Sequence, residues 1–382
     1  MKILPVIDTH RIGGPGKGLI ALVKSLRPYT EIPGVVVFHR ATNGPSDFIR
    51  ALEANGIEPL ILHERSAIDR HVLKRLTALV REHRPDVIQT HGYKASFLAF
   101  LLKLLRRLPK QISWVAWLHG WTSENLKMRV YTMIEKCSVI FADKIICVAG
   151  SLSKKIRAPK RKVSIIHNGI DASYSALPSY NLTKFRDDLK IADRKLIVVI
   201  GRYSFEKGQD RIPAIANELK KITREKFVFL LIGEGPEENK LVELIDQNGL
   251  ADEIRLHPYL SDIRPFYLLA DVCLLPSRSE GMPNVILEAL YLRCPVVSFD
   301  VGGVTEIIQH TAEGLIVEQD NIIALAQAIH KVFSEPHLSD TMRDAGHRKI
   351  CKQFLNSTKA NRVIKTYEEL CLGKHSAQKH EQ

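Results

Sequence analysis

Short apolar runs alternate along the whole chain with longer segments in which apolar and polar residues recur at a helical period. A buried strand of a parallel sheet reads as a short apolar run, and the amphipathic segment that follows covers the sheet as a helix. The predicted strands are residues 3–7, 35–38, 59–62, 87–89, 114–118, 145–148 and 163–166, and then 196–200, 227–232, 254–256, 272–275, 296–299 and 315–317. This alternation predicts βαβ units, hence an α/β protein with parallel sheets.

The pattern restarts in the second half of the chain, and 382 residues are too many for one ordinary core. Residues 172–193 contain Pro178 and few apolar clusters, which marks the boundary. We therefore expect two doubly wound, Rossmann-like domains that face each other across a cleft. The predicted domains are residues 1–175 and 176–355, with a helix at about 356–372 that packs back on the first domain.

The composition narrows the class of protein. A content of 45% apolar and 25% charged residues is that of a soluble globular protein. The net charge of +13 favours anionic partners such as nucleic acid, acidic lipid or phosphorylated small molecules, although a solvated basic surface explains it equally well. The six cysteines form no C-x-x-C pair, so we expect reduced core residues.

Two apolar runs could be taken for a signal peptide or a membrane span, and neither fits. The run at residues 3–7 is too short for a signal peptide, and the run at residues 95–102 is cut by Lys103. We expect a cytoplasmic protein, with a peripheral position on the inner face of the plasma membrane left open.

Glycines and charges follow several predicted strands, where open parallel sheets bind their ligands. Gly14 and Gly16 belong to a glycine-rich loop, residues 13–18, that matches neither a Walker loop nor a dinucleotide fingerprint. The loop either lets a backbone approach a ligand ahead of a helix or forms a tight turn. In the second half, Gly233 and Gly235 form another such turn.

Arg202 and Lys207 flank the turn after residues 196–200. A guanidinium can clamp two phosphate oxygens and an ammonium adds a mobile charge, so this turn suits a diphosphate. The alternative is a pair of solvated surface cations.

The richest segment follows residues 272–275. Pro283 suits the first position of a helix. The free backbone N–H groups around Met282, Pro283 and Asn284 would then lie at the N-terminus of this helix and would stabilise a leaving phosphate. Glu280 precedes this helix and Glu288 lies about a turn inside it, and both carboxylates suit ligand hydroxyls. A third acid, Glu306, follows the next strand and its two glycines.

Together these segments resemble the retaining nucleotide-sugar glycosyltransferases of family 4, which have the two-domain GT-B fold. The matching elements, in the family's order, are residues 13–18, 166–171, 201–208, 233–236, 276–289 and 302–306. Lys17 departs from the family, which commonly has acidic or small residues there.

The resemblance implies a role for each matching residue. Arg202 and Lys207 would hold the donor diphosphate. Glu280 would hold the transferred sugar, together with backbone N–H groups of the loop formed by Gly281, Met282, Pro283 and Asn284. Glu288 would bind the ribose and Glu306 would lie near the donor. His119 matches the first-domain histidine near the reacting sugar, with His91 as a rival.

The resemblance also implies the chemistry. A hexose would pass from a UDP- or GDP-sugar to a hydroxyl group with retention, without a metal or other cofactor, because cations and a helix end stabilise the diphosphate. The acceptor would be a glycan or glycolipid of the cell envelope, such as a cell-envelope polysaccharide or lipopolysaccharide. Basic, apolar-laced stretches at residues 97–110 and 154–162 could rest on an anionic bilayer, or could be ordinary charged outer faces.

Other classes stay open. A nucleotide-sugar epimerase would share this architecture. A nucleic-acid-binding protein could use the positive charge, but we expect no nucleic acid because no basic motif with interleaved aromatic residues is visible. A sugar-binding module without activity would lose Glu280 or Lys207, and this sequence keeps both.

Overall fold

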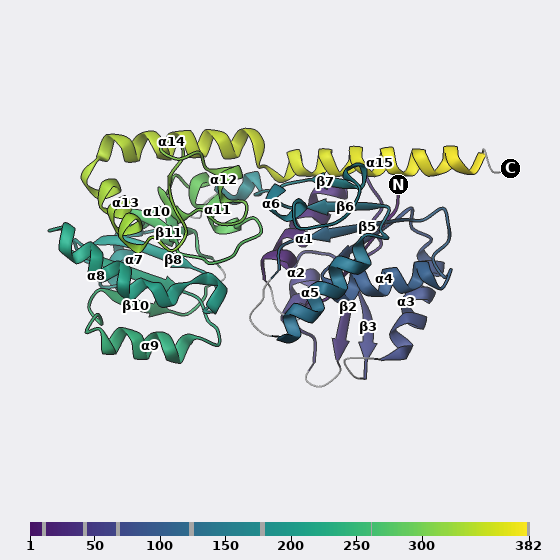
Figure 1. Cartoon of the computed structure of the whole chain (residues 1–382), viewed down its shortest axis with the longest axis horizontal. Coiled ribbons are helices and arrows are strands. Elements are labelled where there is room, and N and C mark those ends of the chain that lie inside the picture. Colours follow the sequence, from purple (N-terminus) through teal and green to yellow (C-terminus); the bar gives the residue numbers. More distant parts are fainter. Residues whose placement is uncertain are drawn as a thin grey trace. The chain divides into compact units, whose positions relative to one another are not determined.

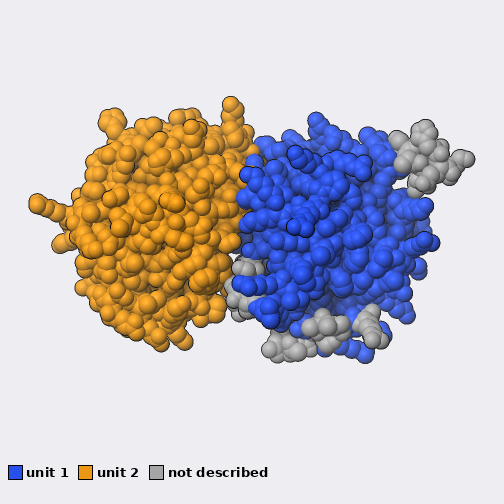
Figure 2. Space-filling model, in the orientation of Figure 1, with its two compact units in different colours: residues 1–169, 356–382 blue, residues 170–355 orange. Residues whose placement is uncertain are grey.

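A computed structural model describes residues 1–9, 13–40, 44–65, 69–121, 126–175, 180–260 and 262–379. The chain forms two compact units, coloured separately in Figure 2. The first unit comprises residues 1–169 and 356–382, and the second comprises residues 170–355. The boundary between the units therefore lies between Gly169 and Ile170, whereas the sequence predicts it after residue 175.

The first unit contains a parallel sheet of seven described strands in the order β3-β2-β1-β4-β5-β6-β7. Most of its strand residues are buried, as expected for a sheet covered on both faces. The strands are β1 (Ile3–Ile7), β2 (Val35–Arg40), β3 (Pro59–Glu64), β4 (Val87–His91), β5 (Ser113–Leu118), β6 (Lys144–Cys147) and β7 (Val163–Ile165). The helices are α1 (Gly14–Leu26), α2 (Asp47–Ala54), α3 (Arg70–His83), α4 (Tyr93–Leu104), α5 (Leu126–Val139), α6 (Gly150–Ser153) and α15 (Asn356–Lys379).

Crossover handedness assigns the helices to the faces of this sheet. The connections through α3, α4 and α5 advance across the sheet in one direction, while those through α1 and α2 advance in the other. Because parallel crossovers are right-handed, α3, α4 and α5 share one face and α1 and α2 share the opposite face (Figure 1).

The second unit repeats the design with six described strands in the order β10-β9-β8-β11-β12-β13. The strands are β8 (Lys195–Ile200), β9 (Phe227–Ile232), β10 (Ile254–His257), β11 (Val272–Leu275), β12 (Val296–Phe299) and β13 (Leu315–Val317). The helices are α7 (Leu182–Asp188), α8 (Ile212–Ile222), α9 (Glu238–Gln247), α10 (Arg264–Leu269), α11 (Asn284–Tyr291), α12 (Val304–Ile307), α13 (Ile322–Ser334) and α14 (Pro336–Gln353).

Each sheet has a point where the strand order reverses, between β1 and β4 in the first unit and between β8 and β11 in the second. Helices leave the sheet to opposite faces on the two sides of such a point, which opens a crevice beyond the carboxyl ends of the strands. The loops after these strands are therefore where each unit is expected to bind its ligand.

The C-terminal helix α15 is built into the first unit. The indole N–H of Trp117 on β5 donates to the hydroxyl of Tyr367 (2.8 Å), which donates to Gln89 Oε1 on β4 (2.6 Å). Near the other end of the helix, Lys374 pairs with Asp143 at 3.0 Å. The contacts of Tyr367 fix α15 to β4, which ends at His91, and to β5, which His119 follows.

The predicted α/β fold class with two wound domains is confirmed, and every predicted strand is present with its end displaced by two residues or fewer. The prediction succeeds because buried parallel strands are continuous apolar runs that few other structures produce. Within the residues that the structure describes, no helix is long and apolar enough to cross a membrane.

Candidate active site

Loops after β8, β11 and β12 bring the predicted donor-binding residues of the second unit together. Gly208 has a φ of +69°, and a side chain there would place its Cβ 2.2 Å from the carbonyl oxygen of Pro276. Gly302 has a φ of +61°, and its Cβ would lie 2.2 Å from the carbonyl oxygen of Glu280. Glycine is needed at both positions because the three loops touch through their backbones.

Gly233 and Gly235 pack the loop after β9 against the loop after β8. A Cβ on Gly233 would lie 2.0 Å from the carbonyl oxygen of Gly201, and one on Gly235 would lie 2.2 Å from that of Tyr203. The Tyr203 N–H also donates to the Glu234 carbonyl at 3.0 Å. Packing between loops therefore accounts for these glycines, and their contact with a donor remains a prediction.

Lys207 and Glu280 form an ion pair at the centre of the joined loops. Lys207 Nζ lies 2.8 Å from Glu280 Oε1, and the Ser277 hydroxyl donates to the same oxygen at 2.7 Å. The Glu280 side chain is only 7% exposed, whereas that of Lys207 is 27% exposed. The carboxylate is thus held in one orientation, and the ammonium remains accessible to an anion.

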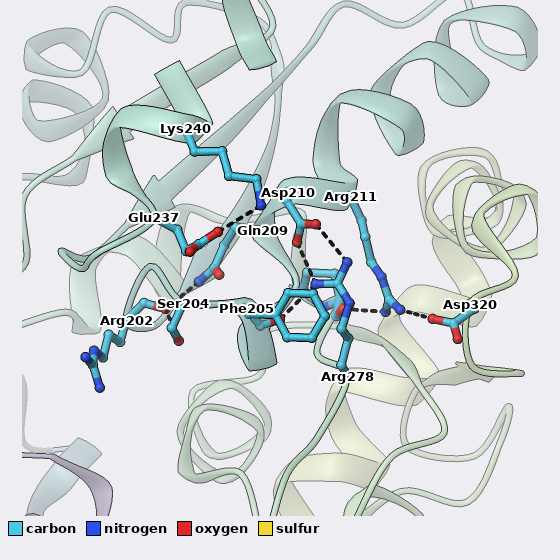
Figure 3. Close-up of polar contacts among 11 residues, drawn as sticks. Arg202, Ser204, Phe205, Gln209, Asp210, Arg211, Glu237, Lys240, Arg278 and Asp320 are labelled. Carbon is cyan, nitrogen blue, oxygen red and sulfur yellow. Dashed lines mark hydrogen bonds and ion pairs between the residues drawn. The ribbon is translucent and has the colours of Figure 1, made fainter. Parts of the chain in front are cut away.

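Arg202 is oriented differently. Its carbonyl accepts a hydrogen bond from Gln209 Nε2 at 2.9 Å, while its exposed side chain extends away from the other labelled side chains in Figure 3. The structure therefore places Arg202 and Lys207 on the same turn but does not point them at one shared partner.

A second set of contacts, which the sequence analysis did not single out, locks two of these loops together. Arg278 binds both carboxylate oxygens of Asp210, at 2.6 and 2.7 Å, and its guanidinium stacks on the Phe205 ring at 4.1 Å (Figure 3). Burial works to raise the pKa of Asp210, but the hydrogen bonds and charge of Arg278 outweigh it and lower that pKa. The Arg278–Asp210 pair fixes the spacing between Lys207 and Glu280. In the sequence, the only signal for Arg278 is that it lies two residues before Glu280.

A neighbouring ion pair joins Arg211 to Asp320, and Arg211 also donates to the Pro276 carbonyl at 3.1 Å (Figure 3). The loop that carries Glu280 is thus tied to the segment after β8 twice, by its own Arg278 to Asp210 and by Arg211 to Pro276.

Helix α11 starts one residue later than predicted. Pro283 was expected at the first helical position, but its extended conformation (φ −74°, ψ 113°) makes it the residue before the helix, which begins at Asn284. Met282 is 5% exposed, so its side chain belongs to the core and only its backbone could serve a ligand. The site residue Gly281 uses its carbonyl to accept the Gly303 N–H at 2.8 Å.

Glu288 and Glu306 lie on α11 and α12, the helices that follow two of these loops. Glu288 Oε2 accepts the Tyr267 hydroxyl at 2.9 Å, and burial, together with the charge of Glu288, raises the pKa of Tyr267 well above its usual value. Glu306 is half-buried in the single turn of α12. Glu288 is therefore already oriented by a buried tyrosine.

The first unit has its own pocket at the point where its strand order reverses. The cavity has a volume of about 150 Å³ and opens among the ends of β1, β4 and β5. Its lining comprises Ile7, Asp8, Thr9, Pro15, His91, Gly92, Trp117, His119, Gly120 and Glu135.

Both candidate histidines line this pocket and contact each other. His91 Nδ1 lies 2.7 Å from His119 Nε2, and Gln89 Nε2 lies 2.6 Å from His91 Nε2. Since Gln89 Oε1 accepts from Tyr367, its amide nitrogen must donate to His91, which leaves His91 Nδ1 as the donor to His119. This chain of hydrogen bonds assigns the proton of His119 to Nδ1.

Neither histidine carries a charge at neutral pH. Burial lowers the pKa of His119 to about 3, aided by the charge of Lys359, and burial lowers the pKa of His91 well below its usual value. His91 is 1% exposed, whereas His119 is partly exposed. His119 is thus the member of the pair that a ligand could reach.

Glu135, on α5, is a pocket residue that the sequence analysis missed. It is 5% exposed, and the Trp121 indole N–H donates to its Oε2 at 2.7 Å. Burial raises its pKa to about 7. No motif surrounds Glu135 in the sequence, and its helix carries apolar residues on the opposite side, so periodicity places it in solvent.

The glycine-rich segment is a helix start and not a loop, which corrects where the sequence placed Gly14 and Gly16, while their contact with a donor stays a prediction. Helix α1 begins at Gly14, and Gly16 is buried so closely that a Cβ would lie 2.9 Å from the Phe48 ring. Gly16 serves packing between α1 and α2, and only Pro15 of this segment lines the pocket.

Within the described part of the chain, no three or more His, Cys, Asp or Glu residues gather as a metal site would require. The residues that could hold an anion are Arg202 and Lys207. The residues that could bind ligand hydroxyls are Glu280, Glu288 and Glu306.

Two family models match the two halves of the chain. One, described as Glycosyltransferase Family 4, matches residues 13–174, and another, described as Glycosyl transferases group 1, matches residues 182–349. Their boundary lies close to the boundary between the two units.

Curated relatives are similar over part of the chain. An alpha-D-kanosaminyltransferase of Streptomyces kanamyceticus is 28% identical over 50% of this chain and 49% of that protein. The capsular polysaccharide biosynthesis glycosyltransferase CapM of Staphylococcus aureus is 26% identical over 74% of this chain and 76% of that protein.

Among solved structures, Anabaena HepE in complex with UDP-glucose aligns with a TM-score of 0.82, covering 97% of this chain and 100% of that one, at 20% identity. At this identity the likeness establishes the fold, a two-domain GT-B architecture, and nothing of the ligand.

Proposed function

We propose a reaction for this chain from one premise: it belongs to the glycosyltransferases, with a family 4 domain followed by a group 1 domain. We propose that it moves a hexose-type sugar from a UDP- or GDP-sugar to a hydroxyl acceptor, with retention of the anomeric configuration. The acceptor we propose is a cell-envelope glycan or glycolipid, the class that the name of the capsular relative indicates for that protein.

The observation that carries this proposal is the Lys207–Glu280 pair with its supporting loops. The accessible ammonium of Lys207 can meet a diphosphate, while Glu280 keeps its second oxygen for a hydroxyl of the sugar. Arg202, on the same turn, supplies a second cation. Charge that develops on a departing diphosphate would be stabilised by groups that need no reorganisation, because the loops already fix them.

The retention that we propose does not need Glu280 as a covalent nucleophile, and its contacts agree with this. Its Oε1 accepts from both Lys207 and Ser277, which lowers its nucleophilicity and suits a positioning residue better than a covalent nucleophile. We propose that the departing phosphate takes the proton of the acceptor hydroxyl on the face of the sugar that it leaves. The neutral His119 would contribute a hydrogen bond and not a charge.

No metal or other cofactor is required in this proposal. The cations Arg202 and Lys207 would neutralise the diphosphate, a task that a divalent ion performs in many nucleotide enzymes.

A thermal-shift panel of UDP, GDP and their hexose derivatives tests the proposed donor class. A ligand at about 100 times its dissociation constant stabilises the folded protein by about 2.7 kcal/mol, which such an assay resolves. Stabilisation by one nucleotide diphosphate and its sugars supports the proposal and identifies the base. If no nucleotide in the panel stabilises the chain, the donor assignment is wrong. Epimer formation without an acceptor would indicate an epimerase of the same fold.

A further inference from the structure

The amphipathic pattern of α5 is inverted. Leu126, Val130, Met133 and Cys137 recur at spacings of four, three and four, so they share one face of the helix. Leu126 is 77% exposed, Val130 is 42% exposed and Met133 is 59% exposed, and Cys137 is exposed too. The buried residues of the helix are Glu135, Ser138 and Val139. A helix of a soluble domain normally buries its apolar stripe, and among the residues that the structure describes nothing covers this one.

The stripe is flanked by positive charge. Lys127, Arg129 and Lys136 lie beside it on α5, and Lys127 and Arg129 are exposed. Among the described residues of α4, α5 and the turn after α4, the one acid is Glu135, which faces inward. A protein partner would have to be both apolar and acidic, whereas an anionic bilayer combines these two properties by nature.

Helix α4 extends this surface. It lies beside α5 on the same face of the sheet (Figure 1) and contributes Phe97, 37% exposed, and Leu104, 62% exposed. Phe141, which follows α5 and is 53% exposed, packs on Phe100 of α4 with ring centroids 4.9 Å apart. Exposed Arg106 and Arg107 follow α4. We call the exposed apolar and basic positions of these two neighbouring helices, with Phe141, Arg106 and Arg107, the α4–α5 face.

We propose that the α4–α5 face docks on an anionic lipid bilayer, with the stripe of α5 inserted among the headgroups and its cations paired with lipid phosphates. The basic stretch at residues 154–162 is a weaker candidate, because Lys162 is held by the carbonyls of Ile140 and Ala142 at 3.1 and 3.0 Å.

Docking there would bring the membrane to the pocket of the first unit. Glu135, which lines the pocket, lies on the side of α5 opposite the stripe, and a helix is about 10 Å across. This step rests on the proposed function: the acceptor would then be a glycan carried on a membrane lipid, whose sugar reaches the pocket while its lipid stays in the bilayer.

Vesicle flotation of the full chain tests the docking face. The parent should float with vesicles of phosphatidylcholine and phosphatidylglycerol, should not float with phosphatidylcholine alone, and should dissociate as salt rises. Leu126→Ser with Met133→Ser should lower the partition coefficient at least about tenfold. Lys127→Ser, Arg129→Ser and Lys136→Ser together should lower it on the order of a hundredfold at low salt.

Two matched controls share the chemistry but lie elsewhere. Val242→Ser with Ile323→Ser removes apolar residues of similar exposure, 45% and 58%, from the second unit. Lys154→Ser, Lys155→Ser and Arg161→Ser remove three exposed cations from the first unit. Both control variants should float like the parent. A parent that fails to float at low salt, or control variants that lose binding as the α5 variants do, would overturn the proposal.

Two further measurements cover the remaining outcomes. An environment-sensitive dye on Cys137 should shift its emission to the blue on anionic vesicles, with the Cys137→Ser protein as blank, and an unshifted dye counts against docking whatever the variants do. Self-association in lipid-free buffer that the Leu126/Met133 variant abolishes, without vesicle binding by the parent, would make the face a protein interface. The thermal shift caused by nucleotides, measured in parallel, tests only the proposed donor function, so its failure can be told apart from a failure of docking.

Discussion

At the scale of single residues, the proposed donor site depends on charges that the fold holds in place. Lys207 is paired with Glu280 yet remains accessible, so its ammonium can exchange part of that contact for a phosphate oxygen. Removing the Lys207 side chain would therefore take away a contact with the ligand and would also leave the Glu280 carboxylate without its ion-pair partner.

Lys207→Ala should weaken binding of the cognate nucleotide diphosphate by about 1.5–3 kcal/mol, a tenfold to hundredfold loss, because a charge-assisted phosphate contact disappears. Isothermal titration measures this directly. Lys240→Ala is the matched control, since Lys240 forms an ordinary surface pair with Glu237 at 3.0 Å. If the Lys207 variant binds nucleotide as tightly as the parent and the control, the role assigned to this loop is wrong.

Glu135 gives a prediction of pH dependence. Its pKa is raised from 4.5 to about 7 by burial, so the folded protein binds more protons than the unfolded chain between these values. The stabilisation from the protonated carboxyl is complete below pH 4.5 and is lost as pH rises through 7. At pH 8 the ionised group should cost up to about 3 kcal/mol relative to a neutral one.

Glu135→Gln should therefore melt at a higher temperature than the parent at pH 8 and at nearly the same temperature at pH 4.5. The lowered pKa of His119 destabilises both proteins alike as pH falls below 6.5, so the difference between the two curves isolates Glu135. A difference that does not change with pH would mean that Glu135 is already ionised in the folded protein.

At the scale of elements, α15 shows how a distant segment can set the chemistry of the first unit's pocket. The hydroxyl of Tyr367 connects Trp117 to Gln89, and Gln89 fixes the tautomer of His91 and through it that of His119. The helix is thus a positioning element for His119, on which it acts through Gln89 and His91.

Tyr367→Phe should lower kcat, leave the KM for the donor unchanged and cost about 1–3 kcal/mol of stability, because Gln89 and Trp117 lose a buried hydrogen-bond partner. Steady-state kinetics with a pH profile separates the effect on His119 from a general loss of stability. Lys365→Ala, on the exposed side of the same helix, should leave both parameters unaltered. Unchanged kcat in the Tyr367 variant would show that the relay has no part in transfer.

Elements and contacts differ in how far the sequence could predict them. The strands were predictable because each is a continuous apolar run, and Arg202, Lys207 and Glu280 were proposed as site residues because they lie in the loops that follow such runs. The helix start at Gly14 was not predicted, since glycine suggests a turn even where, as at Gly16, close packing on Phe48 requires it. Glu135 and the contact of Tyr367 with Gln89, 278 positions apart, carry no local signal at all.

At the scale of the whole molecule, two units with the same wound topology divide the proposed work, with the donor assigned to the second and the acceptor to the first. The second unit carries its cations on its own loops. If these cations neutralise the diphosphate, a divalent ion is unnecessary.

Donor turnover should consequently survive removal of metal ions. EDTA, followed by dialysis into metal-free buffer, should leave the rate of nucleotide release unaltered, and added Mg²⁺ or Mn²⁺ should not raise it. A rate that collapses with EDTA and returns with one of these ions would contradict the proposal that Arg202 and Lys207 are sufficient.

The central claim is retaining transfer from a nucleotide-sugar, and the anomer released by slow donor hydrolysis tests it most directly. With water as the acceptor, proton NMR can follow the first turnover of an α-linked UDP- or GDP-hexose before the free sugar mutarotates. The account predicts that the nucleotide diphosphate appears together with the α-anomer, and that Lys207→Ala slows both in proportion. Initial release of the β-anomer, or no nucleotide diphosphate from any donor, would contradict it.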